Sequence, residues 1–270
     1  MKAVAFLLAL LAGISLSAAD APAGREPVFT ADGKKVVYQI TNETGDSALF
    51  LWDLQTDKTV ELKIEGTSPF RLSDGRVFYR TGGLFAELYE LDLNTLQGKN
   101  IPLEPAIGGV PIETGNGKVV YPAGFDDPPE LYCWDSRSGK VEAEKDFPKN
   151  LQALSPDGKK MVLSTKFKGM DNIALVDRES GKVLYETRQS EVRGCYGAVF
   201  SPDNRYLAYL STGMQPLSDI HLVDLKTLKI IKLTSDGSDN HAPAFSADGR
   251  KMVYCHLKDN IYRLKIVDLP

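Results

Sequence analysis

The chain has 270 residues, 25% of them charged, and a net charge of −4 at neutral pH. This balance, without a long run of one charge or a low-complexity tract, excludes a disordered chain and gives no footprint for nucleic acid, so no DNA or RNA partner is expected. Cys133, Cys195 and Cys255 lie far apart without a CxxC spacing, which argues against a zinc or redox motif and against a disulfide scaffold. We therefore expect free thiols and no cofactor.

The first predicted element is a signal peptide over residues 1–19. A lysine at position 2 precedes an apolar run over residues 3–14, and Ser17, Ala18 and Ala19 supply the small residues of a cleavage site. We expect the mature chain to begin at Asp20. The apolar run is too short to span a bilayer, and Ile14 stands where a bacterial lipoprotein has its cysteine. The sequence thus predicts a protein that neither spans the membrane nor carries a lipid anchor, located in the periplasm or, alternatively, secreted.

After residue 20 the chain consists of a repeated unit with two landmarks. The first is a turn with Asp or Asn at its core, and its six copies are 41 to 46 residues apart. The second, roughly twenty residues later, is an aspartate that follows an apolar residue. The turn residues are Asp32, Asp74, Asn116, Asp157, Asp203 and Asp248, and the later aspartates are Asp53, Asp92, Asp135, Asp177, Asp224 and Asp268. A period near 40 to 45 residues with several short strands is typical of propeller blades.

Within a unit, alternation and turn residues define the strands. In the last unit we expect strands over residues 243–246, 251–255 and 260–267, with the tight turn between the first two. A fourth strand is predicted in the other units over residues 59–64, 99–103, 140–144, 182–187 and 229–233. The sequence predicts one all-β domain over residues 20–270, a six-bladed β-propeller with four-stranded blades and an incomplete last blade. Residues 20–26 contain Pro22, a poor ladder partner, so their deletion is expected to change stability little.

These repeats resemble those of TolB-type propellers. The resemblance is strongest in residues 153–162, 199–208 and 240–253, and weaker in the second and third units, where Arg71 and Glu113 replace the usual apolar residue. It implies a six-bladed propeller in an envelope compartment. Because no counterpart of the TolB N-terminal α/β domain is recognised, TolB's own partners are not implied. We expect Arg71 and Glu113 to pair across the blade interface or to share water in the channel.

The loops between the second and third strands, which share one face, are the predicted protein-binding surface. They contain unusually many large apolar residues with acids between them, a pattern of interaction surfaces. The candidate binding residues are Phe85, Phe125, Asp126, Asp127, Phe167, Met170, Met214 and Leu217. The alternative is that these side chains plug the channel mouth or pack loop on loop.

Catalytic motifs are scarce in the sequence. It has no Gly-x-Ser-x-Gly elbow, no phosphate-binding glycine loop and no His-Glu-x-x-His. One cluster is a candidate metal site, because simple hairpin pairing places His241 opposite His256, where two imidazoles could hold a metal ion. Some related propellers, the oligogalacturonate lyases, use histidines and a divalent metal. The alternative is that His241 is an ordinary first-strand residue.

The sequence therefore predicts an exported protein that is not an enzyme and that binds a protein partner in the cell envelope. One alternative is a carbohydrate-active, metal-dependent lyase that uses the histidine cluster. The other is a structural subunit of an envelope assembly.

Overall fold

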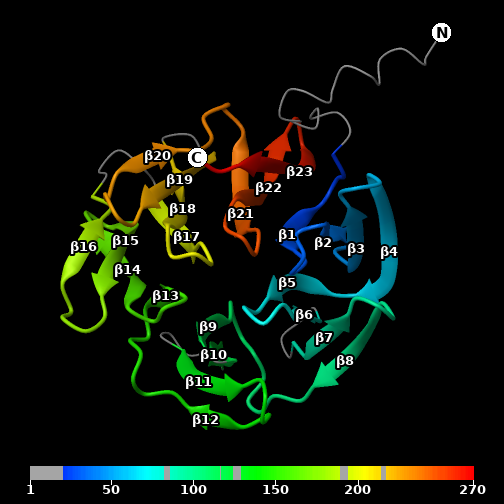
Figure 1. Cartoon of the computed structure of the whole chain (residues 1–270), viewed down its shortest axis with the longest axis horizontal. Helices are drawn as coiled ribbons and strands as arrows, with labels where there is room; N and C mark the ends of the chain where they lie inside the picture. The colour runs from blue at the N-terminus through cyan, green and yellow to red at the C-terminus, as the bar shows by residue number, and fades with distance from the viewer. Residues whose placement is uncertain (1–20, 82–85, 116, 124–128, 189–193, 214–216) are drawn as a thin grey trace.

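The computed structural model describes residues 21–81, 86–115, 117–123, 129–188, 194–213 and 217–270. Every regular element in these segments is a β-strand. The described strands form six consecutive groups, which we call blades 1 to 6, and Figure 1 shows them arranged around a central axis. The prediction of an all-β propeller is confirmed. The predicted signal peptide, residues 1–19, lies outside the described residues.

Blades 1 to 3 are four-stranded antiparallel sheets whose strands follow chain order. Blade 1 contains β1 (Arg25–Phe29), β2 (Lys35–Thr41), β3 (Ser47–Asp53) and β4 (Lys58–Glu65). Blade 2 contains β5 (Thr67–Arg71), β6 (Val77–Arg80), β7 (Leu88–Asp92) and β8 (Gln97–Ile101). Blade 3 contains β9 (Ile112–Gly115), β10 (Lys118–Ala123), β11 (Glu130–Asp135) and β12 (Val141–Ala143).

Blades 4 and 5 are joined by one parallel pairing between Asp171 and Gly194, and blade 6 has three strands. Blade 4 contains β13 (Leu151–Leu154), β14 (Lys160–Phe167), β15 (Met170–Asp177) and β16 (Val183–Glu186). Blade 5 contains β17 (Gly194–Phe200), β18 (Tyr206–Thr212), β19 (Ser218–Asp224) and β20 (Ile230–Lys232). Blade 6 contains β21 (Asp239–Phe245), β22 (Lys251–Lys258) and β23 (Ile261–Asp268).

The recurring aspartates shape the turns at one end of the blades. In blade 4 the Ser155 hydroxyl donates to Asp157 Oδ1 at 2.7 Å, and the Lys159 amide donates to the same oxygen at 3.1 Å. Asp177 Oδ1, in the turn after the third strand, accepts the Ser180 amide at 2.9 Å and its hydroxyl. Such side-chain bonds to nearby amides fix tight turns locally. We call this end of the molecule the turn face and the opposite end the loop face.

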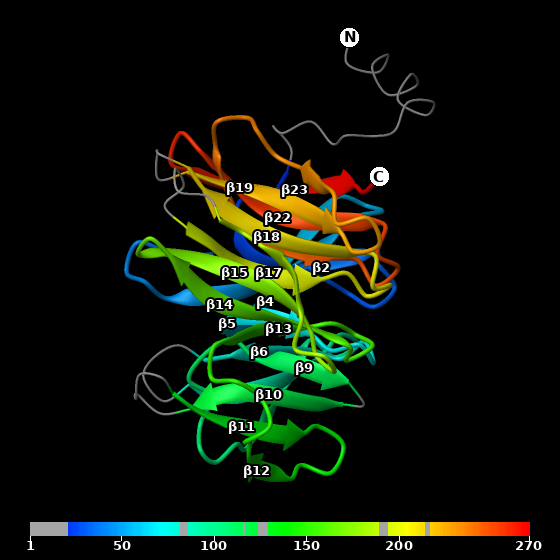
Figure 2. The ribbon, with the colours of Figure 1, turned by 90° about the vertical axis from the view of Figure 1, so that its left-hand side faces the viewer.

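Apolar side chains fill the spaces between neighbouring blades. One cluster joins blade 6 to blade 1, with Val253 and Leu264 packed against Phe29, Tyr38 and Trp52. Similar clusters join blades 1 and 2, 2 and 3, 4 and 5, and 5 and 6. Figure 2 shows the sheets from the side. Because burial of apolar area is the main stabilising term, stacking of adjacent blades stabilises the ring.

The segment before β1 lies between the first and last blades. The Leu264 amide donates to the Pro22 carbonyl at 3.0 Å, and the Cys255 thiol donates to the Gly24 carbonyl at 3.2 Å. Figure 1 shows this segment beside β23. Cys255 is fully buried and unpaired, as is the buried Cys195 in blade 5. These contacts argue against the expectation that deleting residues 20–26 changes stability little. The Pro22 carbonyl accepts a hydrogen bond from β23, although this segment does not form a fourth strand of blade 6.

Bulges interrupt the innermost strands. The pairing register shifts between Tyr196 and Val199 in blade 5 and between His241 and Ala244 in blade 6. Blades 1 and 2 have similar shifts, between Arg25 and Val28 and between Thr67 and Phe70. Each of these four shifts contains a residue of positive φ, namely Glu26, Ser68, Gly197 and Ala242. A bulge adds one residue to one strand of a pair, so every position beyond it pairs one residue away from where simple hairpin counting puts it.

Candidate functional site

Two-residue turns close the loop face of blades 4 and 6. Lys168 and Gly169 in blade 4 have φ of 50° and 80°, as type I′ hairpin turns require. Phe167 and Met170 pair directly across this turn and end β14 and begin β15. The prediction that Phe167 lies outside a strand was wrong, because the tight turn extends both strands to the tip. Met170 is 39% exposed there.

The other predicted binding residues divide into two groups. Leu217 lies on the loop face, immediately before β19. Phe85, Phe125, Asp126, Asp127 and Met214 lie outside the described residues.

A cleft opens on the loop face between blades 5 and 6, with a volume of about 450 Å3. Residues from three places in the chain line it: the end of the β18–β19 loop, the segment from β20 into the start of β21, and the turn between β22 and β23. The lining residues are Leu217, Gly237, Ser238, Asp239, Leu257, Lys258, Asp259 and Asn260. Two of the eight lining residues, Leu217 and Leu257, have apolar side chains and five are polar or charged. The volume falls in the usual range of ligand sites.

Hydrogen bonds hold the walls of this cleft in place. Asp239 Oδ1 accepts the amide of Ser218 at 2.9 Å, which links blade 6 to blade 5. Asp259 and Asn260 both have positive φ and form a type I′ turn. Ser238 is buried, and its hydroxyl has no hydrogen-bond partner among the described residues. The cleft is thus bounded by backbone that these bonds and this turn hold in place, with the Ser238 hydroxyl buried behind its surface.

A polar network lies beneath the cleft. The Asn240 amide nitrogen donates to Asp236 Oδ1 at 3.3 Å and to the Ser238 carbonyl at 3.1 Å, and Asn240 Oδ1 lies 2.9 Å from His256 Nδ1. Lys265 Nζ donates to Asp236 Oδ2 at 3.3 Å. Burial opposes ionisation of Asp236, but the bonds from Asn240 and Lys265 outweigh it and lower its pKa. Burial, and then the charge of Lys265, lower the pKa of His256.

His241 and His256 do not face each other. The bulge pairs His241 with Cys255 and Asn240 with His256, so the prediction of one shared rung was wrong by one residue. Since successive strand residues point to opposite sheet faces, the two rings lie on different sides of blade 6. His241 packs edge-on against Tyr262, with ring centroids 5.5 Å apart. In the described part of the chain no group of three His, Cys, Asp or Glu residues could hold a metal ion.

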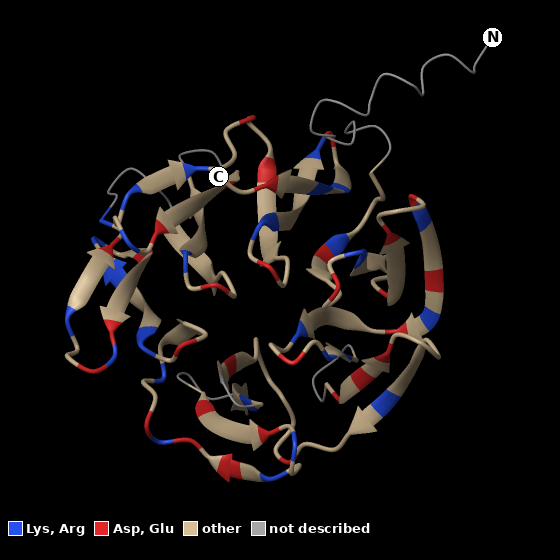
Figure 3. Cartoon of the chain, in the orientation of Figure 1, with Lys and Arg blue, Asp and Glu red and all other residues tan. Residues whose placement is uncertain are grey.

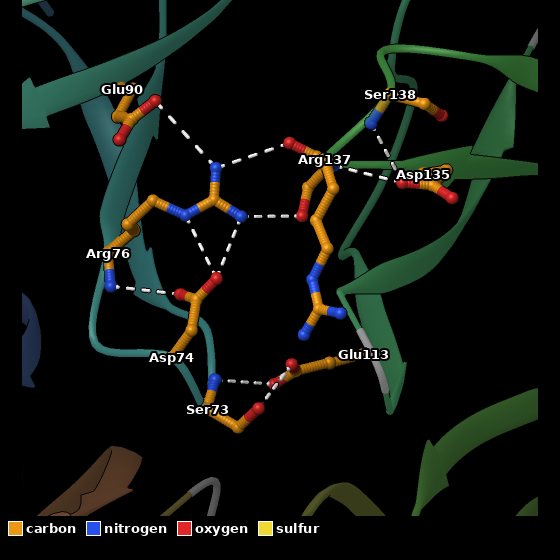
Figure 4. Close-up of polar contacts among 9 residues, drawn as sticks. Ser73, Asp74, Arg76, Glu90, Glu113, Asp135, Arg137 and Ser138 are labelled. Carbon is orange, nitrogen blue, oxygen red and sulfur yellow. Dashed lines mark hydrogen bonds and ion pairs between the residues drawn. The ribbon is translucent and has the colours of Figure 1, made fainter.

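Arg71 and Glu113 are near each other but do not form the predicted pair. Glu113 accepts the amide and the hydroxyl of Ser73 at 2.7 and 2.6 Å, so it does bridge blades 2 and 3. Arg71 Nε is buried without a hydrogen-bond partner among the described residues, and burial lowers the Arg71 pKa although Glu113 opposes this. In a neighbouring link the Arg76 guanidinium donates to the Ser136 hydroxyl at 2.6 Å. Figure 4 shows Arg76 beside Asp74, and Ser73 with Glu113. Glu113 and Arg76 thus join blades 2 and 3.

Acidic and basic residues are interspersed around the ring, as Figure 3 shows. The described residues contain no helix that could cross a membrane.

Two curated proteins match part of the chain. The Tricorn protease homolog 1 of Streptomyces coelicolor is 31% identical over 119 residues, which cover 43% of this chain and 11% of that protein. The Tricorn protease of Thermoplasma acidophilum is 29% identical over 151 residues, 52% of this chain and 13% of that protein. The aligned segments thus span little more than a tenth of either relative. No family model matches the chain.

Solved structures of the same fold cover most of the chain. TolB from Acinetobacter baumannii has a TM-score of 0.67 and 19% identity, covering 88% of this chain and 62% of that one. Oligogalacturonate lyase from Vibrio parahaemolyticus has a TM-score of 0.65 and 16% identity, with 95% and 93% covered. The β-propeller domain of the Trilobed protease from Pyrococcus furiosus has a TM-score of 0.53 and 15% identity, with 92% and 84% covered.

These comparisons correct the prediction that the protein is not an enzyme. Both curated relatives are proteases, so the similarities point to protease-family relatives. The structural similarities, all below 25% identity, show the fold alone. The chain therefore has the fold of a β-propeller, similar to that of TolB.

Proposed function

We propose that this chain is an exported propeller that binds polypeptides on its loop face and acts together with a peptidase. The observation that carries the proposal is the cleft between blades 5 and 6, where Leu217 and Leu257 form apolar walls beside Asp239, Lys258 and Asp259. A polypeptide offers both kinds of group, apolar side chains and a backbone that donates and accepts hydrogen bonds.

The surface around the cleft favours a polypeptide over a small molecule. Met170 and Ile261 occupy equivalent positions, each directly after a two-residue turn, and are 39% and 46% exposed. The pairing of Asp171 with Gly194 attaches the blade 4 hairpin to blade 5. Exposed apolar residues therefore lie on the loop face of blade 4 and of blade 6, one on each side of the cleft, which suits a ligand longer than the cleft itself.

The link with a peptidase rests on the curated relatives, both of which are proteases. Propellers also occur within proteases, as in the Trilobed protease. In this proposal the propeller holds a polypeptide for cleavage by a peptidase, whether the peptidase belongs to the same chain or to another. Export and an envelope location rest on the signal peptide predicted over residues 1–19, with secretion as the alternative. Sequencing the N-terminus of the mature protein tests this part, and the expected first residue is Asp20.

The test of the binding site compares two leucine substitutions. Leu217→Asp places a charge in the cleft, whereas Leu228→Asp makes the same change on the turn face, where Leu228 is 38% exposed. Tagged variants are expressed in cells that make the protein, and the captured fraction is assayed for hydrolysis of fluorescein-labelled casein. We expect Leu217→Asp to lose captured peptidase activity and casein binding by about thirtyfold, as at an interface hot spot worth ~2 kcal/mol. Equal activity in both variants and wild type would place the binding site elsewhere.

A further inference from the structure

A second hollow lies on the other side of the β22–β23 turn from the cleft and shares Lys258 and Asp259 with it. Its volume is about 170 Å3, and it is lined by His256, Lys258, Asp259, Ile261 and Arg263. A polypeptide seated in the cleft would pass this turn. The side chains of the hollow would then contact the polypeptide and select among its chemical groups.

The surroundings of His256 determine which ring nitrogen carries the proton. Asn240 turns its amide nitrogen towards two acceptors, the Ser238 carbonyl and Asp236 Oδ1, so its Oδ1 faces His256 Nδ1 at 2.9 Å. Asp236 Oδ2 is also near Nδ1, at 3.5 Å. With two oxygen acceptors beside it, Nδ1 carries the hydrogen. Nε2 therefore keeps its lone pair, and no described residue forms a hydrogen bond with it.

The charged groups of the hollow are unevenly engaged. One Arg263 N–H donates to the Ala21 carbonyl at 3.4 Å, and the other guanidinium donors have no partner among the described residues. Lys258 is exposed and forms no ion pair with a described residue. Asp259 supplies the negative charge of the lining, at the exposed tip of the turn. Lys265 is engaged with Asp236 beneath the hollow. The lining therefore carries two cations, Lys258 and the partly engaged Arg263, against the one carboxylate of Asp259, and has a net positive charge.

We infer that this hollow binds a carboxylate group of the polypeptide that occupies the cleft, which rests on the proposed function. Arg263 and Lys258 donate to the carboxylate oxygens, and the guanidinium offers the paired donors that match a carboxylate. His256 Nε2 cannot donate, so it accepts a hydrogen bond from an adjacent peptide N–H of the ligand. The exposed Ile261 packs against the aliphatic part of the same residue. The carboxylate comes from an acidic side chain or from a chain terminus.

The test uses small probes of each source and the whole protein. N-acetyl-L-glutamate α-amide carries a side-chain carboxylate, N-acetyl-L-alanine a terminal one, and N-acetyl-L-glutamine amide is a neutral control. Titrations are followed by the NMR signals of the His256 ring, identified with His256→Gln. We expect one or both acids to shift these signals and to raise the measured pKa of His256, since an anion favours the imidazolium, while the neutral amide does neither.

Substitutions then assign the binding groups. Lys258→Gln at the exposed turn and Arg263→Gln are each expected to weaken binding of the effective acid about tenfold, as for loss of a charge-assisted hydrogen bond. Lys226→Gln, an equal loss of charge on the turn face, is expected to change nothing. Acid and neutral probes that bind equally, or acid binding unaffected by Lys258→Gln and Arg263→Gln, would overturn the inference. Either result would leave the proposed function intact, because that is tested separately by Leu217→Asp.

Discussion

The clasp formed by residues 21–24 between blades 6 and 1 leads to a sharp prediction for Gly24→Ala. A Cβ added at Gly24 would lie closer than 3.0 Å to two ring carbons of Tyr38 and 3.2 Å from the Gln39 carbonyl. Tyr38 is 1% exposed and belongs to the cluster that joins the two blades, so the ring has little room to move. We expect the substitution to displace the clasp and to break the bonds from Leu264 to Pro22 and from Cys255 to Gly24.

The magnitude follows from overpacking, which costs typically 1–3 kcal/mol. Taking ~2 kcal/mol, the blade interface should open about thirtyfold more often, and the melting temperature should fall by roughly 4–8 °C for a domain of this size. The direct assay is labelling of Cys255. This thiol is fully buried, and burial raises its pKa to about 12, so it reacts only after opening.

The molecule contains its own control for this assay. In a Cys133→Ser background, Cys195 is buried in blade 5, away from the clasp, and its labelling rate should not change. Gly213→Ala, where an added Cβ meets no atom of the described residues within 4 Å, should leave both rates unchanged. If Gly24→Ala labels Cys255 at the wild-type rate, the clasp does not close the ring. Equal acceleration at Cys195 would indicate global unfolding instead.

Two further predictions concern the bulges and the pH dependence. Gly197 and Ala242 occupy equivalent bulges at φ of 64° and 50°. Because glycine tolerates positive φ better than alanine does, Ala242→Gly should stabilise the fold by ~0.5 kcal/mol and Gly197→Ala should destabilise it by ~1–2 kcal/mol. Denaturant titrations measure both changes, and opposite signs would refute the assigned backbone. Burial, with a smaller effect of Lys232, lowers the pKa of His221, whose Nδ1 lies 3.2 Å from the Tyr209 hydroxyl. As the pH falls, the unfolded chain therefore protonates His221 at a higher pH than the folded chain does. The stability that neutral His221 contributes is fully present above a pH of about 6.5 and is lost as the pH falls below it, so the loss of stability should be less steep in His221→Gln. An unchanged slope would exclude His221.

The propeller could be predicted from the sequence because its turns are local. Asp157 and Asp177 bond to amides two or three residues away, so the residues that shape each turn stand next to it in the sequence. The TolB-like resemblance rested on the same segments. The two-residue turn at Lys168 and Gly169 also had a signal, since glycine favours positive φ. The predicted loop nevertheless included Phe167 and Met170, which belong to β14 and β15.

The histidine register could not be predicted in this way. Its bulge depends on Ala242, a residue with no preference for positive φ, and simple counting across the hairpin therefore placed His241 one residue from its true partner. The candidate cleft was missed for a different reason. Leu217, Gly237 and Lys258 lie far apart in sequence, and only stacking of blades 5 and 6 brings them together.

Photo-crosslinking from the loop face tests the central claim most directly. A benzophenone amino acid replaces Leu217 in one variant and Leu228 in another, and cells that make the protein are irradiated. Crosslinked products are identified by mass spectrometry. The account predicts crosslinks to a peptidase or its polypeptide substrates from position 217 and few from position 228. Crosslinks of equal yield from both positions, or from position 228 alone, would contradict a binding site in the cleft between blades 5 and 6.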